Sequence, residues 1–164
     1  MVMSQFRSLK PGAVQLVFQE PPVNYNPKVE VAACFITVAQ NVLFMKRQPH
    51  KSEGNLWGIP GGKCKKDETA HQAVIREVSE ETGINLTKES LKYFREVYIR
   101  YPEVDFTYHM FAYNLESYPA EIRIDSAEHT EYRWITLQEA LKLPLIRGED
   151  ECIHLVYGEV LKRF

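Results

Sequence analysis

The sequence predicts a single α/β domain in which strand-like and helix-like segments follow one another along the chain. Residues 29–38 form an almost continuous run of apolar and β-branched side chains, which is typical of a strand buried on both faces. Thr69 and Gln72 carry the capping pattern of a helix start, and Gly83 is placed to end that helix. Apolar residues recur with helical periodicity over residues 153–164, which predicts a closing amphipathic helix.

The composition fits one domain with its own core. The chain has 164 residues, of which 45% are hydrophobic and 26% charged. Its net charge of −2 argues against a surface for duplex nucleic acid, which usually carries a strong positive excess. No run approaches the roughly 20 apolar residues that a membrane helix needs. The first ten residues lack an apolar signal core, so we expect a cytoplasmic protein.

The three cysteines are an odd number and match no zinc-binding spacing. We therefore expect Cys34, Cys64 and Cys152 to be free thiols in a reducing compartment.

The remaining segments complete the predicted domain. Residues 1–28, with a short strand at 14–18, are interpreted as an extension or edge segment before a domain at 29–164. Thr136 and Glu139 predict a short capped helix through Leu143. The alternation in residues 106–115 predicts a half-buried strand. Other predicted strands are residues 42–46, which would form a hairpin with residues 29–38, and residues 91–100 and 131–135.

Three carboxylates close together in the sequence give the main indication of a functional site. Glu77, Glu80 and Glu81 lie near the end of the first predicted helix, and their offsets of three and four residues favour a single face. Like charges so spaced repel, and the negative end of the helix dipole disfavours them further. A hard divalent cation such as Mg²⁺, which prefers oxygen ligands, would reverse this balance. The alternative is a solvated acidic face paired with Arg76 or with lysines.

The wider pattern resembles a known family. Gly62, Glu68 and the run REVSEETGI at 76–84 fill every specified position of the Nudix box, and LWGIPG at 56–61 resembles its usual lead-in. About nine fixed positions in a short stretch are far more specific than a single short motif. The chain resembles the Nudix hydrolases (MutT-like) over about residues 29–143, without markers of one substrate branch.

The resemblance implies an α/β/α sandwich with a mixed β-sheet and a loop–helix–loop catalytic element. It implies that Glu77, Glu80 and Glu81 hold Mg²⁺, with Mn²⁺ as a substitute, and that Glu80 and Glu81 serve in catalysis. Gly61 and Gly62 would bind substrate and allow a tight backbone turn beside the metal.

Three further residues of the box are interpreted as structural. Arg76 would hold a glutamate in place, Glu68 would favour the helix start, and Gly83 would end the helix.

Two candidate residues lie outside the box. An acidic residue there often adds a metal ligand or the general base in the family, and Glu128 is the first choice, with Glu131 as the alternative. Both could equally be solvated carboxylates. Arg47, at the end of a predicted strand, could present a cation to phosphates or could be a solvated strand end.

The predicted function is Mg²⁺-dependent cleavage of a phosphoric anhydride bond in a nucleoside diphosphate linked to another moiety. The substrate would then be a nucleoside triphosphate, a nucleotide sugar or a dinucleotide. A non-catalytic nucleotide-sensing module is the alternative, although such modules would be expected to lose box carboxylates. The isopentenyl diphosphate isomerase branch resembles the chain less. We expect a small-molecule partner, no duplex nucleic acid and no membrane, and a homodimer stays an open alternative.

Overall fold

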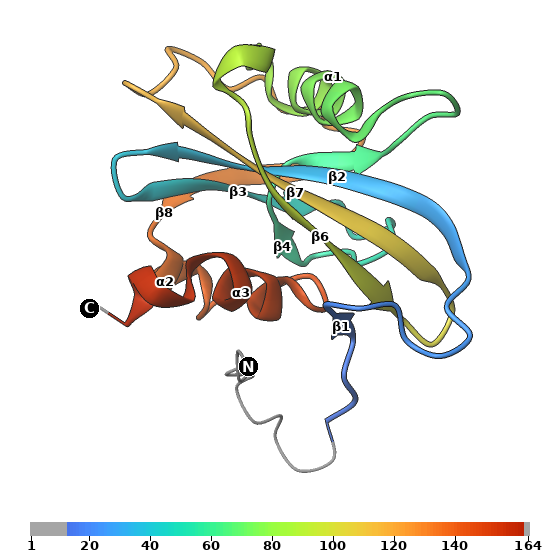
Figure 1. The fold of residues 1–164 in the computed structure, drawn as a ribbon. Coiled ribbons are helices and arrows are strands. Elements are labelled where there is room, and N and C mark those ends of the chain that lie inside the picture. Colours follow the sequence, from blue (N-terminus) through green and yellow to red (C-terminus); the bar gives the residue numbers. More distant parts are fainter. Residues whose placement is uncertain (1–12, 163–164) are drawn as a thin grey trace.

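The computed structural model describes residues 13–162, and its centre is one mixed eight-stranded β-sheet (Figure 1). β2 and β7 pair in parallel, and the other strand pairs are antiparallel. The main strand order is β1 (Val17–Phe18), β6 (Lys92–Arg100), β7 (Asp105–Leu115), β2 (Pro27–Val38), β3 (Asn41–Arg47) and β4 (Trp57–Gly58). In addition, β5 (Gly61–Lys63) pairs with β2, and β8 (His129–Ile135) pairs with β3.

Helices cover both faces of the sheet. Figure 1 shows α1 (Ala70–Thr82) on one face and α2 (Leu137–Ala140) and α3 (Glu149–Leu161) on the other, with a short 3₁₀ turn at Lys88–Ser90. This arrangement is an α/β/α sandwich with a mixed sheet, which confirms the predicted fold class. No helix in the described part of the chain has the length and apolar character needed to span a bilayer.

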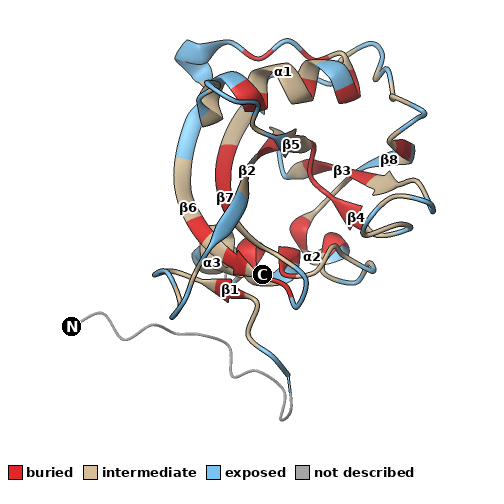
Figure 2. Ribbon diagram, turned by 90° about the vertical axis from the view of Figure 1, so that its right-hand side faces the viewer, coloured by how far each residue is buried: buried red, intermediate tan, exposed pale blue. Residues whose placement is uncertain are grey.

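β2 is buried on both faces, as its apolar run predicts. Ala33 and Phe35 pack into the core beneath α2 and α3, whereas Cys34 and Ile36 pack into the core beneath α1. Figure 2 shows buried residues along the middle of the central strands. The alternating side chains of one strand therefore connect two hydrophobic layers.

β7 is more buried than its alternation predicts. The expectation of a half-buried strand is wrong, because all residues from Thr107 to Phe111 are buried. β7 lies between β6 and β2, with Met110 facing the α3 side and Phe111 the α1 side. A central strand covered on both faces buries its polar positions together with its apolar ones.

α1 begins and ends at the predicted residues. The Thr69 side chain accepts a hydrogen bond from the Gln72 backbone N–H at 3.1 Å, and the Gln72 side chain accepts one from the Thr69 N–H at 2.9 Å. Gly83 adopts φ 79°, a left-handed conformation that glycine reaches without a Cβ clash. These two caps determine which turn of the helix carries the glutamates.

Other predicted boundaries shift. α2 ends at Ala140 rather than Leu143, because Pro144 disfavours helical backbone in the residue before it. The predicted strand at 14–18 is reduced to β1, and the predicted loop before α1 contains β4 and β5. The predictions for Phe164 and for the first ten residues lie outside the described part of the chain. All three cysteines are free, as predicted.

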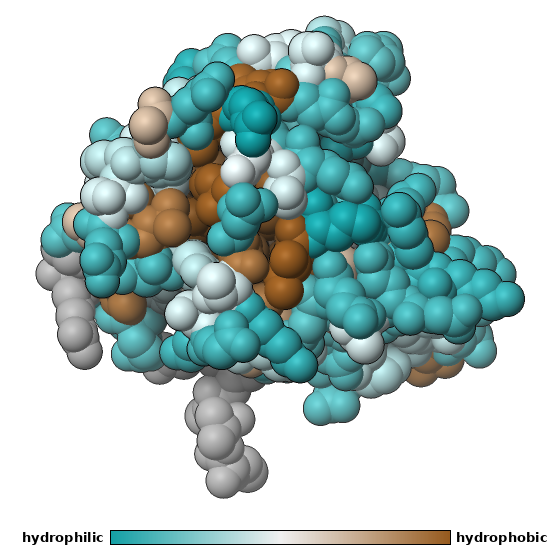
Figure 3. Space-filling view, turned by 90° about the horizontal axis from the view of Figure 1, so that it is seen from above, coloured by the Kyte–Doolittle hydropathy of each residue, from teal (hydrophilic) through white to brown (hydrophobic). Residues whose placement is uncertain are grey.

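The surface above α1 is mostly hydrophilic, but a central band of hydrophobic side chains reaches it (Figure 3). The core beneath α1 is bordered by partly buried apolar residues, which include Ile75, Leu91, Leu115, Ile122 and Ile124. Partly buried apolar side chains therefore border this layer at the surface.

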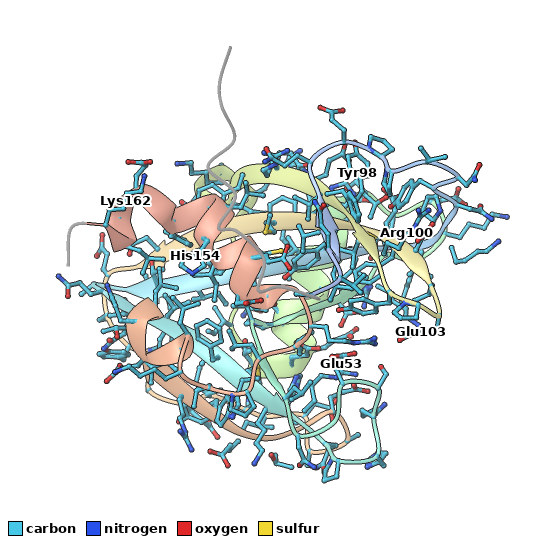
Figure 4. The ribbon with its side chains drawn as sticks, turned by 90° about the horizontal axis from the view of Figure 1, so that it is seen from below. Glu53, Tyr98, Arg100, Glu103, His154 and Lys162 are labelled. Atoms are coloured by element: carbon cyan, nitrogen blue, oxygen red, sulfur yellow. The ribbon has the colours of Figure 1, made fainter. Side chains whose placement is uncertain are left out.

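Arg147 connects the loop after β3 to the turn between β6 and β7. Its Nε donates to Glu53 Oε1 at 2.6 Å, and its guanidinium also pairs with Glu103. The guanidinium carbon lies 3.8 Å from the centre of the Tyr101 ring, whose hydroxyl donates to the Arg147 carbonyl at 2.7 Å. Glu53 and Glu103, labelled in Figure 4, approach Arg147 from these two segments. The backbone of residues 48–56 is thus tied to the sheet.

The carboxyl of Glu149 at the start of α3 should make stability depend on pH. Burial raises its pKa to about 7, and within the described residues its Oε1 has no hydrogen-bond partner. The folded state then binds more protons than the unfolded state between about pH 4.5 and 7, so this group makes stability fall as pH rises through that window. A shift of this size corresponds to roughly 3 kcal/mol.

We expect Glu149→Gln to flatten this part of the profile and to be more stable than the parent above pH 7. Urea unfolding in metal-free buffer at a series of pH values measures the effect. Glu159→Gln, an exposed residue near the other end of the same helix, is the matched control and should leave the profile unchanged. An unaltered slope in Glu149→Gln would contradict the assignment.

Candidate functional site

Glu81 points from α1 into the protein. Only 5% of the residue is exposed, and its Oε2 accepts a hydrogen bond from the Gly61 backbone N–H at 3.0 Å. The pKa of the Glu81 carboxyl is raised to about 8, mainly by burial and in part by the charge of Glu77, against the lowering effects of the Gly61 bond and Arg47. Glu81 is therefore a buried acid whose ionised form needs added positive charge.

Glu77 lies against the neighbouring residue of β5. A Cβ at Gly62 would lie 2.4 Å from Glu77 Cδ, and a Cβ at Gly61 would lie 2.3 Å from the Ala32 carbonyl oxygen. Glycine is required at position 61 because the β5 backbone passes too close to the β2 backbone for a side chain, and glycine at position 62 leaves room for the Glu77 carboxylate. The expected tight turn is absent: residues 61–62 are extended strand, and the reason for glycine is space.

Arg76 forms ion pairs with carboxylates on the outer side of α1. Its guanidinium makes two bonds to Glu68, at 2.8 and 2.9 Å, and one to Glu77 Oε1 at 2.8 Å. The bonds from Arg76 lower the pKa of Glu68 to about 2. Glu80 also pairs with Arg76 at 3.3 Å, and 54% of its side chain is exposed.

The three box glutamates lie on one side of α1, as their spacing predicts, but their side chains have different surroundings. Glu81 is buried, Glu77 lies over β5 and Glu80 faces solvent. In the described residues, no three His, Cys, Asp or Glu side chains are already arranged to hold one metal ion. The ion pairs of Glu77 and Glu80 with Arg76 match part of the solvated-face alternative, whereas the inward Glu81 does not.

Arg47 and Glu128 approach Glu81 from the other side of the site. Pairing of β3 with β8 sets Arg47 opposite His129. The charge of Arg47 lowers the pKa of the Glu81 carboxyl, and that of Glu128 raises it. Burial lowers the pKa of His129 to about 4, with Arg47 adding to the effect, so the imidazole is neutral. Two segments far apart in sequence thus act on one buried carboxyl.

Glu128 is held by contacts that the sequence did not reveal. Lys51 Nζ lies 2.7 Å from Glu128 Oε1, and the backbone N–H of Gln48 donates to the Glu128 carbonyl at 2.9 Å. No local pattern links the loop after β3 to the segment before β8, and the pairing of those strands creates the contact. Glu131 instead pairs with Arg133 at 3.1 Å on the exposed part of β8.

The donor set fits a hard divalent cation. Glu77 and Glu81 provide carboxylate oxygens against consecutive residues of β5, and oxygen is the donor that Mg²⁺ prefers. A bound cation would favour the ionised form of Glu81, which burial and neighbouring carboxylates now disfavour. Rotation of the exposed Glu80 side chain would add a further oxygen.

Comparison with known proteins agrees with this geometry. The NUDIX domain model matches residues 27–156. A CTP pyrophosphohydrolase of Escherichia coli is 30% identical over 71% of this chain and 82% of its own length. An 8-oxo-dGTP diphosphatase of Proteus vulgaris is 42% identical over 39% of this chain, and the match spans 58% of that protein.

A solved structure has the same fold. The MutT protein of Methanosarcina mazei superposes with a TM-score of 0.69 over 83% of this chain and 96% of its own, at 24% identity. Because a family model covers most of the chain and pyrophosphohydrolases are among its relatives, this protein is a member of the Nudix hydrolase family.

Proposed function

We propose that the protein is a Mg²⁺-dependent pyrophosphohydrolase that cuts a phosphoric anhydride bond in a nucleoside diphosphate derivative. One observation carries the proposal: Glu77 and Glu81 lie against consecutive residues of β5. In addition, the charge of Arg47, at the end of β3, lowers the pKa of the Glu81 carboxyl, and the charge of Glu128, just before β8, raises it. Carboxylates for a cation, an arginine for phosphate and a carboxylate for water are the groups that this hydrolysis requires.

Each residue then has a role. Bound Mg²⁺ would polarise the phosphorus and neutralise charge on the phosphate oxygens. Glu77, Glu80 and Glu81 would hold it, and Arg47 would bind a phosphate oxygen. Glu128 would accept a proton from water as the new O–P bond forms and the anhydride P–O bond breaks. Arg76 would keep Glu77 oriented through the bonds described above.

A nucleotide substrate is supported by the relatives, whose names refer to CTP and 8-oxo-dGTP. Nucleoside triphosphates are therefore the first class to test, followed by nucleotide sugars and dinucleotides. Analysis of the phosphate products in a screen of these compounds would identify the bond that is cut. Binding of nucleotides without any hydrolysis would instead favour the sensing module.

Metal dependence is the first test. We expect hydrolysis to stop in excess chelator and to return with Mg²⁺ or Mn²⁺, because burial disfavours the ionised Glu81 without a cation. Phosphate release in metal-depleted and metal-replete buffer measures this. Full turnover in metal-depleted buffer would refute the mechanism.

Glu81→Gln tests the buried acid. The change retains the shape and removes the charge, so we expect kcat to fall about a hundredfold or more, as for loss of a transition-state electrostatic contact. The fold should persist, with unchanged or higher stability in metal-free buffer at neutral pH, because burial of glutamine requires no proton uptake, whereas burial of Glu81 does. Glu89→Gln, on the exposed 3₁₀ turn, is the control. Turnover near the parental value in Glu81→Gln would exclude the role.

Glu128→Gln separates three roles in one variant. Loss of a general base should lower kcat and kcat/KM together, with partial rescue at high pH. Loss of a metal ligand should shrink as Mg²⁺ is raised, since mass action refills a weakened site. A change below about twofold would assign Glu128 to the solvated surface, as for most exposed substitutions.

A further inference from the structure

Lys51 is the cation in direct contact with Glu128. Its ammonium nitrogen lies 2.7 Å from Glu128 Oε1, and 33% and 32% of the two side chains are exposed. This distance makes the contact a charge-assisted hydrogen bond. The partial exposure lets water or another ion replace either partner at modest cost.

The backbone around Lys51 is fixed while its side chain is not tied elsewhere by the contacts seen in the described residues. Gln48 binds the segment before β8 through its backbone N–H and through Nε2, which donates to the Ser126 carbonyl at 2.7 Å. On the other side, Arg47 Nε donates to the Ser52 carbonyl at 2.8 Å, and Arg147 binds Glu53. A flexible four-carbon stem therefore extends from an anchored point beside Glu128.

Lys51 also lies near the positions proposed for the divalent cation and the substrate phosphate. Glu128 acts electrostatically on Glu81, so an ion held by Glu81 is within reach of the Glu128 charge. An ammonium on Glu128 opposes a divalent cation there and attracts a phosphate. Arg47 Nε is bonded to the Ser52 carbonyl, and no contact between Arg47 and Glu128 is seen in the described residues.

We propose that Lys51 is a substrate-binding residue that neutralises Glu128 in the free protein and moves to a phosphate oxygen when a divalent cation takes Glu128. The divalent cation and Lys51 compete for one carboxylate, and that carboxylate and phosphate compete for one ammonium. Each binding event then favours the other, which couples metal binding to phosphate binding. This inference rests on the metal and phosphate roles in the proposed function. It takes Glu128 as a metal ligand, one of the three roles that the Glu128→Gln test separates, in place of the general base.

Metal binding alone tests the first half. Mn²⁺ affinity is measured by titration calorimetry in the parent, Lys51→Met, Glu128→Gln and the double variant, without substrate. We expect Lys51→Met to bind Mn²⁺ about threefold more tightly or better, the scale of an exposed ion pair, and to have no such effect in the Glu128→Gln background. Lys51→Arg should restore parental affinity, and Lys88→Met, an exposed lysine on the 3₁₀ turn, is the charge control.

Phosphate binding tests the second half. With saturating Mn²⁺, methylene diphosphonate serves as a non-hydrolysable probe. We expect Lys51→Met to weaken its binding about tenfold, the change for one charge-assisted hydrogen bond.

Three results would overturn the proposal: unchanged Mn²⁺ affinity in Lys51→Met, an equal gain in the Glu128→Gln background, or unchanged diphosphonate affinity. Circular dichroism of each variant excludes a folding defect as their source. Failure of the proposed function is distinguishable, since a protein that binds Mn²⁺ and diphosphonate as expected but hydrolyses no nucleotide refutes only the hydrolysis. A parent that binds no Mn²⁺ refutes both.

Discussion

The close contact between β5 and α1 is the constraint on which the site depends. Two consecutive glycines let the β5 backbone pass against β2 on one side and against Glu77 on the other. The Gly61 N–H then becomes the hydrogen-bond donor for the buried Glu81. A side chain at Gly61 would push β5 away from β2, and a side chain at Gly62 would displace the Glu77 carboxylate, so either change would disturb the support that β5 gives to the two carboxylates.

Charge on α1 is only partly balanced by local pairing and by distant residues. Arg76 pairs with Glu68, Glu77 and Glu80 on the outer side, but its single positive charge offsets only one of the three carboxylates. On the inner side Glu81 has no ion pair among the contacts seen in the described residues, and burial disfavours its charge while Arg47 from another part of the sheet favours it. The helix therefore carries excess negative charge that a bound cation would offset.

Local patterns predicted the helices and strands well where capping residues and hydrophobic periodicity agree within a few residues. The caps of α1 and the two-sided burial of β2 follow from neighbouring residues, and both are observed. The predicted burial of β7 was wrong because the alternation of its side chains does not show which elements cover the two faces of the strand. The different burial and contacts of Glu77, Glu80 and Glu81 depend on where β5 lies, and helical spacing alone cannot show that. Lys51 was missed because its partner is brought to it by the pairing of β3 with β8.

The parallel pairing of β2 with β7 has a consequence for folding order. Its register extends from Pro27 opposite Asp105 to Val38 opposite Leu115 and joins segments separated by β3, α1 and β6. Parallel strands need a crossover connection, and closing so long a loop is entropically costly and slow. The hairpin of β2 with β3 and the capped α1 can form from local contacts, but the two hydrophobic layers cannot close before β7 inserts between β6 and β2. Formation of the site is therefore coupled to non-local strand pairing, both of β2 with β7 and of β3 with β8, whose paired residues are farther apart in the sequence.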